Sequence, residues 1–135
     1  MVRLISVLLA VAMLNDPAAA PGWRAAALVA TAPDAPVRVG AYAVFRADCT
    51  IGPMPEIRLQ HPPRNGTVEL PAGTLTTSRV PRCPGLSAPA RVVVYRPNPG
   101  FVGLDDLGFE VVNPGARQIE RHAVTVAVGN AALRH

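Results

Sequence analysis

The side chains best suited to covalent chemistry in this 135-residue chain are two cysteines, Cys49 and Cys83. The N-terminal residues have the pattern of an export signal, and two cysteines in an exported protein most simply form one disulfide. Neither cysteine has a neighbouring cysteine or histidine at the spacing of a metal site. We therefore expect a bridge that ties the end of one strand to a long loop. The alternative is a free or metal-binding pair.

The residues for acid-base or nucleophilic catalysis are few and scattered. Ser78 and Ser87 lie in no Gly-x-Ser-x-Gly turn, which is the sequence context of the hydrolase nucleophile. The three histidines are far apart in sequence: His61, His122 and His135. We predict no catalytic residue, no metal ligand and no cofactor. The alternative is a copper or zinc site assembled by folding from His61, His122 and Met54.

Asp105 and Asp106 are consecutive, so on a strand their carboxylates point to opposite faces of the sheet. A shared calcium ion is therefore not expected from this pair. We predict that Asp105 instead accepts backbone N–H bonds from the turn at residues 101–103, as aspartates at strand entries do.

The formal net charge of +4 comes from arginine alone, because the chain contains no lysine. The arginines are scattered and never form the block of five to eight basic residues that marks a nucleic-acid patch. Specific nucleic-acid binding is therefore not expected. Loose attraction to an anionic polymer through outward arginines such as Arg38, Arg46 and Arg58 stays open.

The N-terminus has the pattern of an export signal. Arg3 precedes an apolar run over residues 4–14, which is too short to span a bilayer, and Ala18, Ala19 and Ala20 supply a small-residue cleavage site. We predict a signal peptide over residues 1–20 and a periplasmic or secreted protein. Because Pro21 disfavours cleavage at that point, a cut after Ala27 and retention as an uncleaved anchor are alternatives.

Period-two alternation of apolar and polar residues defines the rest of the chain. Residues 21–36 are rich in Ala and Pro and are predicted to be a disordered leader. An all-β domain is predicted over residues 37–130, with Phe45 facing inward on its first strand. Asn65 and Gly66 are predicted to form a hairpin turn between strands at residues 56–60 and 67–70. Further strands are expected near residues 74–80, 91–96, 107–112 and 118–128, with a long loop over residues 81–90.

About seven short strands separated by turns favour a two-sheet antiparallel sandwich over a barrel. The segment from Pro63 to Val68, Pro-Arg-Asn-Gly-Thr-Val, is followed by a second motif and a Val-Thr-Val end. The second motif consists of Tyr95, Pro97, Gly100, Phe101, Gly103, Asp105, Leu107 and Phe109. Together these motifs resemble bacterial Ig-like and cadherin-like repeat domains over roughly residues 57–128.

The resemblance implies an Ig-like β-sandwich used for adhesion, surface display or spacing in the cell envelope. The chain departs from the pattern in carrying a single copy, a cysteine pair and a longer loop between its middle strands. The calcium-binding linker of cadherins is also missing from the sequence. We therefore expect an exported, non-enzymatic module that contacts an envelope protein or polymer. The sequence leaves the partner and the oligomeric state open.

Overall fold

The computed structural model describes residues 27–115 and 118–129, and this part of the chain is all-β. The expected signal segment lies outside the described residues. Eight strands follow one another: β1 (Ala27–Thr31), β2 (Val37–Tyr42), β3 (Glu56–His61), β4 (Gly66–Glu69), β5 (Ala72–Thr77), β6 (Leu86–Pro97), β7 (Gly103–Asn113) and β8 (Gln118–Val128). No helix within this part of the chain is long and apolar enough to cross a membrane.

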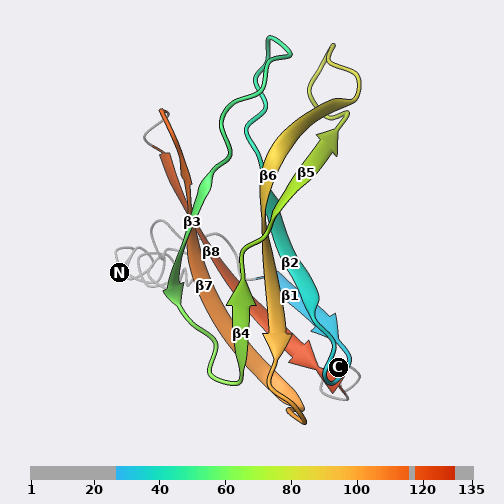
Figure 1. Ribbon diagram of the computed structural model, residues 1–135, viewed down its shortest axis with the longest axis vertical. Coiled ribbons are helices and arrows are strands. Elements are labelled where there is room, and N and C mark those ends of the chain that lie inside the picture. Colours follow the sequence, from blue (N-terminus) through green and yellow to red (C-terminus); the bar gives the residue numbers. More distant parts are fainter. Residues whose placement is uncertain (1–26, 116–117, 130–135) are drawn as a thin grey trace, which may run out of the picture.

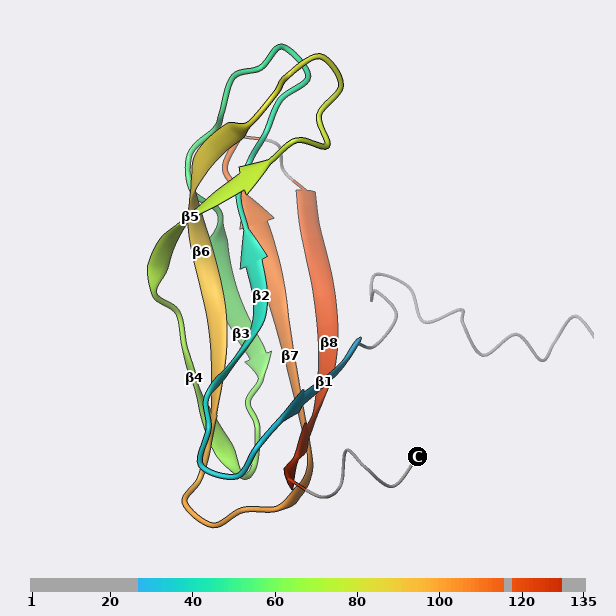
Figure 2. The same ribbon diagram turned by 90° about the vertical axis from the view of Figure 1, so that its right-hand side faces the viewer.

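The strands form two sheets that face each other, as the edge-on view in Figure 2 shows. One sheet has the order β1-β8-β7-β3, and the other has the order β2-β6-β4, with β5 also paired to β6. Only β1 and β8 run parallel, and the other pairs are antiparallel. The predicted two-layer β-sandwich is therefore confirmed, with eight described strands rather than seven.

The core lies between the sheets and contains the inward residues of the central strands. Alternate residues of β6, β7 and β8 are buried, which confirms the predicted inward faces of β7 and β8. The main buried side chains are Val93, Tyr95, Leu107, Phe109, Val111, Val124, Val126 and Val128. Aromatic rings are few, so Tyr95 and Phe109, both fully buried, supply the largest volumes.

The predicted hairpin at Asn65 and Gly66 is wrong. β3 pairs with β7, whereas β4 pairs with β6 in the opposite sheet, so the connection between β3 and β4 crosses from one layer to the other. The two-residue turn favoured by Asn-Gly needs positive φ angles, and neither residue has one here. Long-range contacts made by this connection therefore override its local turn preference.

Gly66 is needed because the connection passes directly against Tyr95. A Cβ at this position would lie 2.5 Å from Tyr95 Cε1 and 2.7 Å from the Arg96 carbonyl oxygen. We expect Gly66→Ala to lower the free energy of unfolding by about 1–3 kcal/mol, as overpacking does. At Gly73 on β5, the nearest atom to such a Cβ is Val92 Cγ2 at 3.2 Å, so Gly73→Ala is the matched control. Urea denaturation should rank the two variants in that order, and equal losses would contradict the close approach.

Order begins earlier than predicted. Residues 27–31 were expected in a disordered leader, but they form β1, which pairs with β8 from Ala27↔Val124 to Thr31↔Val128. Val29 packs against the core from this strand. The sequence pattern did not predict this strand, because four of the five residues that connect it to β2 are alanine or proline. The domain therefore starts at or before Ala27, and a cut after Ala27 would remove a paired residue.

The inward face of β2 also differs from the prediction. A bulge between Arg38 and Gly40 shifts the alternation, so that Tyr42 packs against the core although it was expected to face outward. The strand ends at Tyr42, and Phe45 is half-buried in an isolated bridge with Ile51. A bulge adds one residue without a sequence signature, so simple alternation could not reveal it.

The loop expected over residues 81–90 is shorter than predicted. Residues 86–90 belong to β6 and pair with β5 from Thr77↔Leu86 to Gly73↔Ala90. Proline is unusual inside a sheet because it has no backbone N–H to donate. Residues 86–90 of β6 pair with β5 alone, so Pro89 has a neighbouring strand on one side only. The two proline-rich connections, residues 43–55 and 78–85, project from the same end of the sandwich (Figure 1).

Candidate functional site

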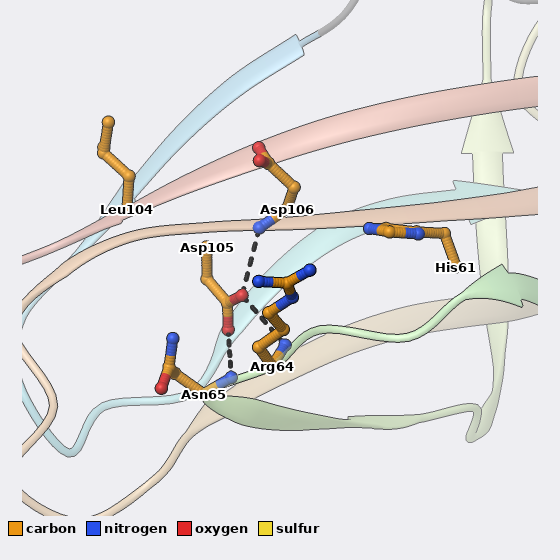
Figure 3. A pocket seen from close by; sticks show the side chains of 6 residues that line it. All are labelled: His61, Arg64, Asn65, Leu104, Asp105 and Asp106. Atoms are coloured by element: carbon orange, nitrogen blue, oxygen red, sulfur yellow. Dashed lines mark hydrogen bonds between the residues drawn. The ribbon is translucent and has the colours of Figure 1, made fainter.

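Asp105 is the most fully engaged polar side chain in the described interior. It is only 4% exposed and projects inward from β7. Its Oδ1 accepts hydrogen bonds from the backbone N–H of Arg64 at 3.0 Å and of Asp106 at 3.1 Å. Its Oδ2 accepts from the Asn65 N–H at 2.9 Å and from the Tyr95 hydroxyl at 2.9 Å. Figure 3 shows the carboxylate lying between β7 and the connection to β4.

The predicted role of Asp105 as an acceptor of backbone N–H bonds is correct in kind but wrong in its partner. The bonds come from the connection at Arg64 and Asn65, about forty residues away, and not from the turn at residues 101–103. In that turn the Phe101 N–H bonds to the Asn98 carbonyl oxygen at 3.1 Å. The prediction failed because an inward-facing carboxylate on β7 is directed across the sandwich, away from its own loop.

Tyr95 completes this network from the opposite sheet. Its hydroxyl donates to Asp105 and lies 3.4 Å from the Asn65 carbonyl oxygen. Burial raises the pKa of the Tyr95 phenol, and the hydrogen bond and the charge of Asp105 raise it further. The phenol therefore stays protonated at physiological pH and acts as a fixed donor.

A polar hollow of about 430 Å³ lies beside this network, and Figure 3 shows the side chains that line it: His61, Arg64, Asn65, Leu104, Asp105 and Asp106. Both carboxylates are already engaged, because the Asp106 Oδ1 accepts from Thr125 Oγ1 at 2.7 Å. As predicted, the two aspartates point to opposite faces, with Asp105 buried and Asp106 exposed. The arrangement joins β3, β4 and β7, and we assign Asp105 a structural role.

The structure does not bring His61 and His122 together. His61 pairs with Gly108 on the outer face of its sheet, whereas His122 pairs with Phe109 and stacks on that ring inside, with centroids 5.4 Å apart. The two imidazoles therefore project from opposite faces and cannot share one ion. Within the described residues, no cluster of three or more His, Cys, Asp or Glu side chains has metal-binding geometry. Ser87 bonds to Thr76 rather than to a histidine.

Tyr42 on β2, Phe109 on β7 and His122 on β8 form an aromatic cluster, in which Phe109 is buried and the other two rings are half-buried. The Tyr42 ring meets Phe109 edge-on at 5.8 Å and lies 5.0 Å from the His122 ring. His122 Nε2 lies 3.2 Å from Glu120 Oε1. The sequence pattern missed Tyr42 as part of this cluster because the bulge in β2 reverses its direction.

Tyr42 should titrate well above an ordinary tyrosine. Burial, followed by the charge of Glu120, raises its pKa from 10.0 to about 12. In the folded protein the phenol keeps its proton where the unfolded chain has lost it. The stability contributed by the protonated, part-buried Tyr42 phenol is therefore complete below pH 10 and is lost as the pH rises toward 12. Absorbance at 295 nm should show no tyrosine ionising near pH 10 in the folded protein, and Tyr42→Phe should remove the step near pH 12. A folded-state step at pH 10 that Tyr42→Phe abolishes would contradict this assignment.

The predicted disulfide between Cys49 and Cys83 is confirmed, with the two Cα atoms 5.3 Å apart. It joins the connection over residues 43–55 to the connection over residues 78–85, and these two segments together are called the disulfide end. Cys83 is buried, whereas Cys49 is exposed. Cys49 and Arg82 both have left-handed backbone conformations, with φ of 68° and 66°. Such residues persist where the surrounding structure holds them.

Three arginines lie on the disulfide end: Arg46, Arg79 and Arg82. All three are exposed, and Arg46 Nη1 donates to the Ile51 carbonyl oxygen at 3.0 Å. The outward direction of Arg46 was expected, but its grouping with Arg79 and Arg82 was not. More than thirty residues separate Arg46 from the other two, so only the bridge and the fold place them at one end. The sequence signal that could have predicted this grouping is that each of the two paired cysteines lies close to an arginine.

No protein-family model, curated protein or solved structure matches this chain.

Proposed function

We propose that this chain is an exported, non-enzymatic Ig-like module that acts by surface contact with a component of the cell envelope through its disulfide end. The observation that carries the proposal is the disulfide end itself. Two irregular loops are joined covalently and hold exposed arginines on a rigid base of paired strands. Binding residues are commonly carried on loops that a rigid scaffold positions.

The strand order supports the Ig-like assignment. With β4 and β5 taken together as strand D, β2, D and β6 correspond to B, D and E in one sheet, and β3, β7 and β8 correspond to C, F and G in the other. The first strand, β1, differs from the constant-type pattern because it pairs with β8. The motif residues Tyr95, Leu107 and Phe109 form the centre of the core. The disulfide departs from the Ig pattern, because it joins two loops at one end instead of linking the sheets.

Export is supported by two independent observations. The first residues have the pattern of a signal peptide. The Cys49–Cys83 bridge is of the kind that persists in oxidising compartments such as the periplasm and is rare in the cytosol. We therefore propose a periplasmic or secreted location.

Contact through the disulfide end can be tested by capture from envelope extracts. The oxidised protein is immobilised and compared with an Ile51→Ser/Arg82→Ser variant at the disulfide end. A Val102→Ser/Leu104→Ser variant is the control, because Val102 and Leu104 are exposed at the opposite end. We expect one component to be retained by the wild type and by the control, and to be lost from the Ile51/Arg82 variant. Retention by all three proteins, or by none at low salt, would overturn the proposal.

A further inference from the structure

We propose that the disulfide end binds an anionic polymer whose repeating phosphate or carboxylate groups are held by the guanidinium groups of Arg46, Arg79 and Arg82. This inference rests on the proposed function and names the class of ligand. It rests on the pairing of the described charges, on the hydrogen bonds and the disulfide that hold the two loops, and on the small number of exposed apolar side chains at this end.

Charge pairing differs between the disulfide end and the rest of the described domain. Outside the disulfide end, three of the six described arginines have carboxylate partners within 3.0 Å: Arg58–Glu56, Arg96–Glu69 and Arg121–Glu110. On the disulfide end, residues 43–55 and 78–85 carry three arginines and one aspartate. Surface carboxylates thus balance half of the described arginines outside the disulfide end, while three arginines against one aspartate leave the disulfide end with a net positive potential toward solvent.

The single carboxylate of this end is already engaged. Asp48 Oδ1 accepts hydrogen bonds from both the hydroxyl and the backbone N–H of Thr50, the latter at 3.1 Å. These two bonds lower the pKa of Asp48, and the bond from the Thr50 hydroxyl has the larger effect. The carboxylate therefore stays ionised and bound to Thr50. It closes the turn of residues 46–50, and because the charge of Arg46 is the smallest of the causes that lower its pKa, it offsets that guanidinium only in part.

The loops that carry the arginines are fixed by backbone hydrogen bonds. Arg46 N–H donates to the Thr50 carbonyl oxygen at 2.9 Å, and Cys49 N–H donates to the Arg46 carbonyl oxygen at 3.1 Å. In the second loop, Cys83 N–H donates to the Val80 carbonyl oxygen at 3.1 Å. With the disulfide added, little backbone order has to be gained on binding, which favours affinity.

A hollow of about 340 Å³ accompanies the arginines on the second loop. It is lined by Ser78, Val80, Pro81, Arg82, Cys83 and Pro84. The Ser78 hydroxyl and the Arg82 guanidinium supply donors at its rim, and guanidinium groups match the geometry of phosphate and carboxylate oxygens. An anionic group that enters this hollow can therefore contact Ser78 and Arg82.

The side chains at this end favour a soluble polymer over a membrane surface. Membrane-surface segments place aromatic or large aliphatic side chains next to their basic residues. Among residues 43–55 and 78–85, Phe45 is the one aromatic residue and is half-buried, while Ile51 is 40% exposed. Such limited apolar exposure leaves electrostatic attraction as the main contribution, and a linear polyanion supplies that attraction without insertion.

The experiment measures binding of the oxidised protein to inorganic polyphosphate, to poly-L-glutamate and to vesicles containing an anionic phospholipid. Three ionic contacts predict a loss of affinity of roughly 20- to 40-fold between 50 and 200 mM salt, taking the salt slopes known for nucleic acids. With Arg79→Gln/Arg82→Gln, the remaining contact predicts a loss of only roughly threefold over the same range. Arg58→Gln/Arg96→Gln removes the same charge at paired arginines and should leave the wild-type slope.

Binding to either polymer that the Arg79/Arg82 variant weakens and the Arg58/Arg96 variant does not supports the inference, and the preferred polymer identifies phosphate or carboxylate. Equal weakening by both variants shows diffuse attraction and overturns it, as does binding to vesicles alone. Circular dichroism and a thiol assay establish that each variant is folded and bridged. If envelope capture depends on the disulfide end while neither polymer binds, the proposed function stands and this inference fails.

Discussion

Replacing Asp105 with alanine is expected to lower the free energy of unfolding by about 3–5 kcal/mol. The carboxylate is 4% exposed and accepts from two N–H groups of the β3–β4 connection and from the Tyr95 hydroxyl. Removing it takes away the acceptor of the buried Tyr95 hydroxyl and of two part-buried N–H groups. Urea denaturation measures the loss, and Asp105→Asn should fall between alanine and wild type because its amide retains one acceptor oxygen.

Asp106 offers a matched control at the next position. It has the same side chain but lies exposed on the outer face, where it accepts from Thr125. Asp106→Ala is therefore expected to change stability by less than about 1 kcal/mol. Similar losses at the two positions would show that Asp105 does not hold the connection in the way proposed. The Tyr95 phenol gives a second readout, because its pKa should fall in Asp105→Ala when the hydrogen bond and the nearby charge are removed.

The second large effect is expected from opening the disulfide. Cys49 and Cys83 are 34 residues apart, and closing a loop of this length contributes about 3–4 kcal/mol in the chain-entropy model. The double variant Cys49→Ala/Cys83→Ala should lose this amount in urea denaturation, with the same cooperative transition at a lower midpoint. Wild-type protein treated with a thiol reductant should shift similarly, because Cys49 is exposed to solvent.

A second consequence of opening the bridge concerns the disulfide end alone. The strands pair independently of the bridge, so far-ultraviolet circular dichroism should keep its β signature in the double variant. Polymer binding should weaken, because the two loops are no longer held together and the order lost must be restored on binding. A double variant within about 1 kcal/mol of wild type would show that the bridge contributes far less than the chain-entropy model predicts.

Periodicity in the sequence correctly predicted the elements that carry the core. Leu107, Phe109 and Val111 on β7, and Val124, Val126 and Val128 on β8, are all buried as expected, although Gly108 and Ala127 between them are buried as well. A strand with one buried face must repeat every two residues, so this information is local and readable. The disulfide was also predictable, because two cysteines allow only one intramolecular pairing and the N-terminal pattern predicts an oxidising compartment.

Features that depend on contacts between distant segments were not predictable. The Asn65–Gly66 step has a strong local preference for a hairpin turn, but the Asp105 carboxylate and the Tyr95 ring impose another conformation. β1 lacked an amphipathic pattern and is ordered through pairing with β8. The bulge that turns Tyr42 inward is set by the match between β2 and β6.

The sequence by itself determined the all-β class, the inward faces of the central strands and the disulfide, because each depends on neighbouring residues or on simple counting. The tertiary structure alone decided which sheet each strand joins, where the Asp105 carboxylate finds its donors and which arginines share one end. Those outcomes depend on the packing of two layers, in which residues thirty to forty positions apart come into contact. The candidate binding surface belongs to this second group, because it is assembled from two loops that only the folded sandwich brings together.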